Sequence, residues 1–141
     1  QILLQLYNYK GTVHSYNKDI TEAIKQFMTA VRIAKEVNMK TEVVNEYNYA
    51  LLMALKKDRL TYEPILNEAF EYGYSFSDED LKIINLSFIA STYLDKTYSL
   101  DSSKRDEISK RMSDLYGEDW QLSTKELAAK LDAEYSLRNP K

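Results

Sequence analysis

The sequence predicts an all-α fold, and its composition and its hydrophobic period are the two observations that predict it. Only three glycines and two prolines occur among the 141 residues, so few residues are available for the tight turns of a many-stranded sheet. Apolar residues recur at three- and four-residue steps, which is the period of a helix with one buried face. With 44% apolar residues, the chain predicts a single folded domain over residues 1–141.

The helix at residues 19–37 has the clearest signals at both ends. Asp19 stands at the N-cap position, Glu22 follows at the capping-box position, and Asn38 comes after the last apolar residue as a C-cap. Between them, one apolar face is formed by Ile20, Ala23, Ile24, Phe27, Ala30, Val31, Ala34 and Val37.

The same signals predict two further helices in the middle of the chain. Thr41 is expected to cap a helix that ends near residue 55. The next helix is expected to open at Asp58 or Thr61, with Pro64 tolerated in its first turn, and to close at Gly73.

The last third of the chain predicts three more helices. Ser77 is expected to start a single helix that carries Leu81, Ile84, Phe88 and Tyr93, with acidic residues in its first turn.

A further helix is expected to open at Asp101 or Ser102 and to end at Gly117. Ser123 with Glu126 forms a capping box for the last one. Together with a first helix before residue 19, which carries Tyr7, Gly11 and His14, this makes about seven expected helices of roughly 12 to 20 residues, joined by short connections.

A pattern of small and large residues recurs along the chain. On the first repeat it comprises Tyr7, Gly11, His14, Ala23, Phe27 and Ala30. These spacings resemble the tetratricopeptide repeat, in which small residues mark the contact of two antiparallel helices and an aromatic ring fills the gap beside it.

Shifts of 39 and then 40 residues repeat this pattern, with Ala50 and then Ala90 in the position of Gly11. Two residues depart from it: Glu46 stands where an apolar residue is expected, and Tyr62 stands where a small one is expected.

The resemblance implies a right-handed superhelix of antiparallel helical hairpins, a TPR-like α-solenoid. Its units would cover residues 4–38, 41–76 and 80–117, and a closing helix at 123–137 would cover the apolar side of the last unit. The first helices of such units line a concave groove that binds peptides. In this sequence the implied groove residues are Asn8, Tyr9, Thr12, Tyr16, Tyr47, Asn48, Leu51, Ser87, Ser91 and Asp95.

The groove expected from the resemblance is aromatic and polar with hardly any charge. A neutral or mildly apolar peptide suits it better than a chaperone's acidic tail, because an unpaired carboxylate is costly to desolvate.

The composition argues against several other functions. The net charge is −3 and no stretch concentrates positive charge, so we expect no nucleic-acid partner. No apolar run approaches the ~20 residues of a membrane span. With no cysteine and His14 as the single histidine, the sequence offers no metal site, and it shows no motif for a cofactor or for catalysis.

We therefore expect a peptide-binding or protein-binding scaffold, or a regulatory sensor module of a bacterial cytoplasmic protein. The chain reads as a fragment of a longer protein, so its own flanking domains are candidate partners. The alternative is a structural module for self-assembly, for example as a homodimer. An all-α enzyme is the third alternative.

Overall fold

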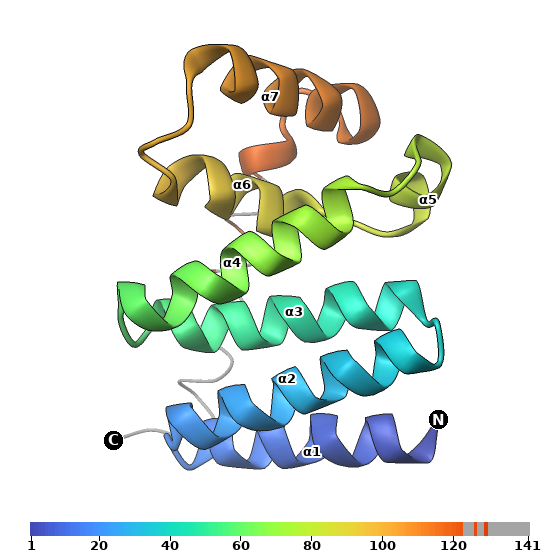
Figure 1. The fold of residues 1–141 in the computed structure, drawn as a ribbon, viewed down its shortest axis with the longest axis vertical. Helices are drawn as coiled ribbons and strands as arrows, with labels where there is room; N and C mark the ends of the chain where they lie inside the picture. The colour runs from blue at the N-terminus through green and yellow to red at the C-terminus, as the bar shows by residue number, and fades with distance from the viewer. Residues whose placement is uncertain (123–125, 127–128, 130–141) are drawn as a thin grey trace.

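Four helices at the N-terminal end of the molecule stack in chain order, each antiparallel to the one before it (Figure 1). They are α1 (Ile2–Tyr16), α2 (Ile20–Glu36), α3 (Lys40–Leu55) and α4 (Arg59–Tyr74). The structure is a computed structural model that describes residues 1–122, 126 and 129.

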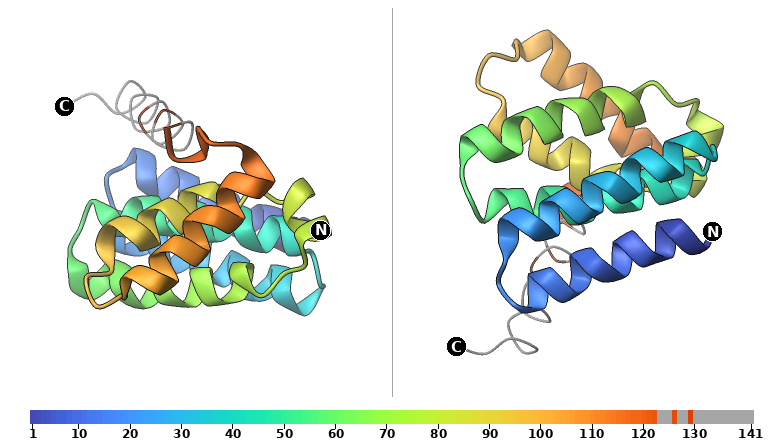
Figure 2. Two further views of the ribbon diagram at one scale, coloured as in Figure 1. Left: turned by 90° about the horizontal axis from the view of Figure 1, so that it is seen from above. Right: turned by 60° about the horizontal axis from the view of Figure 1, so that its bottom comes forward.

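Two short helices follow, α5 (Asp78–Ile83) and α6 (Ser87–Lys96), and then α7 (Ser102–Tyr116), which is as long as α1. Figures 1 and 2 place α7 at the end of the stack opposite to α1. The described part of the chain contains helices and no strand, which confirms the predicted all-α class.

The contact between α1 and α2 follows the predicted pattern of small and large residues. Ala23, Phe27 and Ala30 have no exposed surface. A Cβ atom added to Gly11 would lie 2.7 Å from the Phe27 ring, so only glycine lets α1 approach this close. Small residues therefore set the spacing of the first hairpin, and Phe27 fills it.

Side-chain caps begin four of the helices at the predicted residues. Asp19, Asp58, Ser77 and Asp101 each accept a hydrogen bond from a backbone amide three residues further on. The predicted cap at Thr41 is wrong, because α3 begins at Lys40 and its N-cap residue, Met39, makes no side-chain bond.

Left-handed backbone ends two helices where the sequence predicted an end. Asn38 has a φ of 56°, and Gly117 has a φ of 94°. Gly73 was expected to do the same for α4, but it lies inside that helix. Its role is close packing, since a Cβ atom there would lie 2.3 Å from Leu86 Cδ1.

The single helix expected to start at Ser77 is interrupted. Ile84 is extended, with φ −99° and ψ 115°, and α6 starts only after Leu86. The Asn85 side chain accepts a hydrogen bond from the Ser87 amide at 2.8 Å, which replaces a helical bond at the new helix start.

The Tyr116 hydroxyl, on α7, satisfies the backbone at this interruption. It lies 2.6 Å from the Leu81 carbonyl oxygen and 2.8 Å from that of Ile84, and it accepts a bond from the Leu86 amide at 3.1 Å. Backbone groups that leave a helix must find other partners when they are buried. The break between α5 and α6 is therefore stabilised by a residue 30 or more positions away.

The predicted closing helix at residues 123–137, with its capping box at Ser123, lies outside the described residues. Residues 120–122 are already helical, three positions ahead of that predicted cap. Trp120 is 5% exposed and belongs to the core.

Candidate functional site

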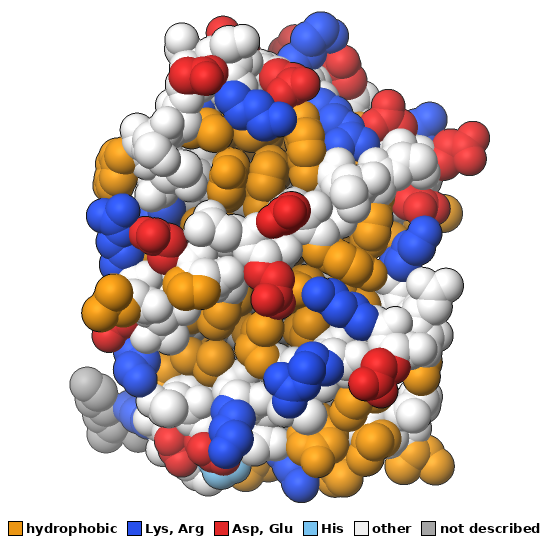
Figure 3. Space-filling view, in the orientation of Figure 1, with side chains coloured by type: hydrophobic (Ala, Val, Ile, Leu, Met, Phe, Trp, Pro, Cys, Tyr) orange, Lys and Arg blue, Asp and Glu red, His pale blue; other side chains and the backbone are white. Residues whose placement is uncertain are grey.

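An open hollow of about 820 Å³ lies between α4 and the α6–α7 part of the molecule. Its walls come from one side of α4, from Tyr93 and Lys96 on α6, from residues 97–99 and from Lys104 on α7. We call it the α4–α6–α7 hollow. Figure 3 shows hydrophobic side chains gathered between α7 and α4, with basic side chains above them. The volume is in the range of pockets that hold ligands.

The spacing of aromatic residues on α4 builds the floor of this hollow. Tyr62, Leu66, Phe70 and Tyr74 recur every fourth residue, so they share one face of the helix. Phe70 stacks on Tyr93 of α6 with ring centroids 3.8 Å apart and on Tyr74 with centroids 4.8 Å apart. Rings that are stacked in this way offer a rigid apolar surface to a ligand.

Tyrosine hydroxyls make this surface amphipathic. Tyr62 and Tyr93 are half-buried, and Tyr98 is 79% exposed at the rim. Within the described part of the chain, none of these three hydroxyls has a hydrogen-bond partner. The hollow therefore combines apolar area with free donors and acceptors, a combination that is common in binding surfaces.

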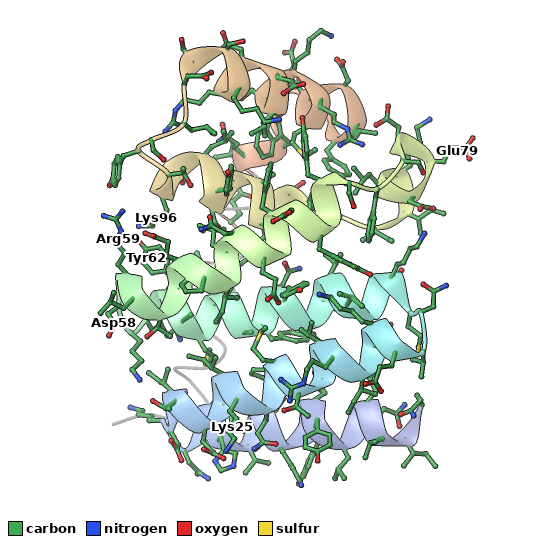
Figure 4. The ribbon with its side chains drawn as sticks, viewed as in Figure 1. Lys25, Asp58, Arg59, Tyr62, Glu79 and Lys96 are labelled. Atoms are coloured by element: carbon green, nitrogen blue, oxygen red, sulfur yellow. The ribbon has the colours of Figure 1, made fainter. Side chains whose placement is uncertain are left out.

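Three cations line the hollow, and they differ in their partners. Arg59 Nε lies 2.6 Å from Glu63 Oε2, and Lys104 Nζ lies 2.9 Å from Glu107 Oε2. Lys96 Nζ lies 6.0 Å from the centre of the Tyr62 ring and forms no ion pair with a described residue. Figure 4 shows Arg59, Tyr62 and Lys96 together at the N-terminal end of α4.

Two arginines of α7 hold the borders of the hollow in place. Arg105 donates to the carbonyl oxygens of Leu94 at 2.7 Å and Leu100 at 3.3 Å, and also to that of Thr97. These contacts close the C-terminal end of α6 and the connection that follows it. Charge-assisted bonds of this kind are stronger than neutral ones, so this border is firmly held.

Arg111, the second of these two arginines, fixes the backbone at the C-terminal end of α4. Its guanidinium donates to the carbonyl oxygens of Tyr74 and Phe76, both at 2.6 Å, and to the Asp78 carboxylate at 3.0 Å. The guanidinium carbon also lies 4.7 Å from the centre of the Tyr74 ring. The aromatic floor therefore rests on a fixed backbone.

A second, smaller hollow of about 310 Å³ lies between α1 and α3. Glu46, at 3% exposure, lines it and accepts bonds from the Asn8 amide nitrogen at 2.8 and 3.0 Å. Burial raises the pKa of Glu46 to about 7, and the nearby Glu42 charge acts in the same direction, while the Asn8 bond opposes them. Glu46, the acidic residue that departs from the repeat pattern, is thus buried and hydrogen-bonded to the neutral amide of Asn8.

The structure spreads the ten predicted groove residues over different environments. Tyr9 and Asp95 are exposed, whereas Asn8, Thr12, Tyr16 and Asn48 are half-buried. Thr12 bonds back to the Asn8 carbonyl oxygen at 2.9 Å, and Asn8 is engaged with Glu46. None of the ten lines the α4–α6–α7 hollow.

Four of the ten are buried, which corrects the expectation that they face an open groove. Tyr47 and Leu51 have no exposed surface, and Ser87 and Ser91 retain 5% and 3%. The reason at Tyr47 is the packing of α3 between α2 and α4: its ring lies 5.9 Å from that of Tyr72, and its hydroxyl donates to Glu68 at 2.7 Å.

Tyr62, Tyr93 and Lys96 were not predicted from the sequence as members of a site. Tyr62 stands where the repeat predicts a small residue, but the pattern assigns that position to the contact between α3 and α4. The departure from the pattern therefore gave no indication of the hollow between α4 and α6.

Among the described residues, no group of three or more His, Asp or Glu side chains could hold a metal ion. The helices of the described residues also fall short of the length and apolarity that a bilayer span requires.

Comparisons of the chain with protein-family models, with curated proteins and with solved structures found no match.

Proposed function

We propose that this chain is a TPR-like helical repeat module that binds a peptide or protein segment in the α4–α6–α7 hollow and catalyses no reaction. The observation that supports binding is the stacked aromatic floor of Phe70, Tyr74 and Tyr93 at the bottom of an open hollow. Aromatic anchors with free hydroxyls dominate the energetics of many protein contacts.

The repeat interpretation is supported by the small residues at the helix contacts. Gly11 faces Phe27 of α2, and Gly73 faces Leu86, the residue that precedes α6, each at a distance that excludes a Cβ atom. On this proposal the helices form a right-handed superhelix, as tetratricopeptide hairpins do. The module would serve a regulatory bacterial protein of the cytoplasm, with the segment supplied by another protein or by a flanking domain of its own.

The binding proposal can be tested with a display library of random 12-residue peptides, selected against the 141-residue chain at low salt. We expect enriched peptides whose binding falls at least about fivefold in Tyr62→Ala, because removal of an aromatic anchor commonly costs about 1 kcal/mol or more.

Tyr9→Ala is the matched control, since Tyr9 is an exposed tyrosine of α1 that does not line the hollow. Peptides that bind Tyr62→Ala as well as the unchanged chain would contradict the proposed site. A selection that enriches no peptide would contradict the function itself.

Self-association is the second candidate function, and one observation favours it. The first helix exposes a row of apolar side chains: Ile2 at 86%, Leu3 at 46%, Leu6 at 43% and Tyr9 at 66%. An exposed apolar stripe on a terminal helix can pack against the same stripe of a second copy around a twofold axis. Sedimentation equilibrium of the chain and of Leu6→Lys decides this, because a dimer should dissociate in the variant.

A further inference from the structure

Lys96 is the cation of the α4–α6–α7 hollow that has no counterion in the described structure. The other two lining cations are neutralised at 2.6 and 2.9 Å by Glu63 and Glu107. A lysine in the last turn of a helix ordinarily complements the carbonyl groups at that end. Here Arg105 already binds the Leu94 and Thr97 carbonyl oxygens, so the α6 terminus does not need Lys96 for this purpose.

The position of Lys96 places this positive charge beside an aromatic ring at one end of the hollow. Figure 4 shows Lys96 and Arg59 next to Tyr62, at the start of α4. Glu71, a lining acid whose side chain forms no ion pair or hydrogen bond with a described residue, lies 12 residues beyond Arg59 along α4, or roughly 18 Å at 1.5 Å per residue. Glu63, paired with Arg59, and Lys104, paired with Glu107, also line the hollow, so the lining charges left unpaired are positive at Lys96, near the start of α4, and negative at Glu71, further along it.

The positive charge of Lys96 and the aromatic floor together determine which chemical groups of a ligand the hollow can bind. An anionic group placed at Lys96 gains an attractive ion pair that becomes stronger as its partner removes water from the hollow. A side chain attached one or two residues away can then pack on Tyr62, whose ring lies beside Lys96, and on the part of Tyr93 that the stacked Phe70 ring leaves uncovered. A cationic group at the same position would be repelled by Lys96.

We propose that the segment bound in the α4–α6–α7 hollow is acidic: an aspartate or glutamate pairs with Lys96, and an aromatic side chain within two residues of it packs on Tyr62 and Tyr93. This inference rests on the proposed binding function and adds the chemistry of the partner. It differs from the neutral peptide expected for the groove of the first helices, because the hollow supplies a cation that those positions lack.

Two parallel selections from the same random 12-residue peptide library test this inference, one against the unchanged chain and one against Lys96→Glu. On the unchanged chain we expect enriched peptides to carry Asp or Glu within two residues of an aromatic residue. On Lys96→Glu we expect Lys or Arg at that position.

Resynthesised peptides with capped termini then give the size of the effect by fluorescence anisotropy. Replacing the selected Glu by Gln should weaken binding to the unchanged chain about fivefold, and replacing it by Lys should weaken it about twentyfold. The order should reverse on Lys96→Glu.

The control variant is Lys25→Glu, which makes the same change of charge at an exposed lysine of α2 that Figure 4 shows far from the hollow. It should retain the preference of the unchanged chain, which separates a local ion pair from the effect of net charge.

Two outcomes would overturn the inference, and they have different consequences for the proposed binding function. Peptides that lose binding in Tyr62→Ala but keep the same charge preference on the unchanged chain and on Lys96→Glu would refute the acidic partner while leaving the binding function intact. If no peptide depends on Tyr62, the binding function fails and the inference fails with it.

Discussion

The two halves of this molecule are held together by different interactions. From α1 to α4, long antiparallel helices pack through small residues, and core side chains such as Phe27 and Tyr47 have no exposed surface. In the second half α5 and α6 are short, and three polar side chains of α7 bind the backbone of neighbouring segments: Arg105, Arg111 and Tyr116. Packing of apolar side chains stabilises the first half. In the second half, hydrogen bonds from α7 side chains to backbone carbonyl oxygens fix the segments that border the hollow.

The comparison implies that the first half should respond most strongly to a core cavity. Phe27→Ala is expected to lower the free energy of unfolding by about 3–5 kcal/mol, because the ring fills the space above Gly11 and its removal leaves a void. Urea denaturation followed by circular dichroism measures the change. A loss below 1 kcal/mol would mean that the α1–α2 contact does not depend on this ring.

The second half should respond to the loss of a single polar side chain. Arg111→Ala is expected to lower the free energy of unfolding by roughly 2–3 kcal/mol, because it removes charge-assisted bonds to the Tyr74 and Phe76 carbonyl oxygens.

Lys110→Ala is the control for Arg111→Ala, because the neighbouring Lys110 forms an exposed pair with Asp114 at 2.9 Å. It should change stability by no more than about 0.5 kcal/mol. Equal losses of stability in the two variants would show that the backbone hydrogen bonds of Arg111 stabilise the fold no more than an exposed ion pair does.

A pH effect is expected in the first half from Glu46. Its pKa in the folded protein is raised to about 7, above the ordinary value of 4.5, mainly by burial. The folded state therefore binds the proton more tightly than the unfolded state does, and stability from this group is full below about pH 4.5 and falls as the pH rises towards 7.

The measurement compares the unchanged chain with Glu46→Gln at pH 5 and pH 8. We expect the stability difference between the two to shift by about 2–3 kcal/mol, with the variant favoured at pH 8. Parallel pH profiles of the two proteins would contradict the raised pKa.

The sequence predicted the first half better than the second for a physical reason. Ala23, Phe27 and Ala30 act between helices that are adjacent in the chain, so their spacing alone reveals the contact. The interruption at Ile84 depends on the Tyr116 hydroxyl, 32 residues away, and no local period records such a bond. An uninterrupted helix from Ser77 was the natural prediction from the local pattern.

The candidate site was less predictable than the fold. Tyr47 stood at a position that faces a groove in regular arrays, yet α4 covers it, and the hydroxyl is bound to Glu68. Tyr62 and Tyr93 come from helices separated by α5 and the interruption after it, so their proximity depends on the path of the chain between them. Only the three-dimensional arrangement reveals that Lys96 has no counterion among the described residues.

The position of Trp120 gives the protein an optical reporter for one of its two halves. It is the single tryptophan of the chain, it is 5% exposed, and it directly follows α7 through the turn at Gly117. Its emission therefore reports whether the chain beyond α7 keeps its native environment, whereas far-ultraviolet circular dichroism averages over every helix. Midpoints that coincide for the two signals mean that the halves unfold as one cooperative unit. An earlier fluorescence midpoint would mean that the polar-bonded half opens while the hairpin stack remains folded.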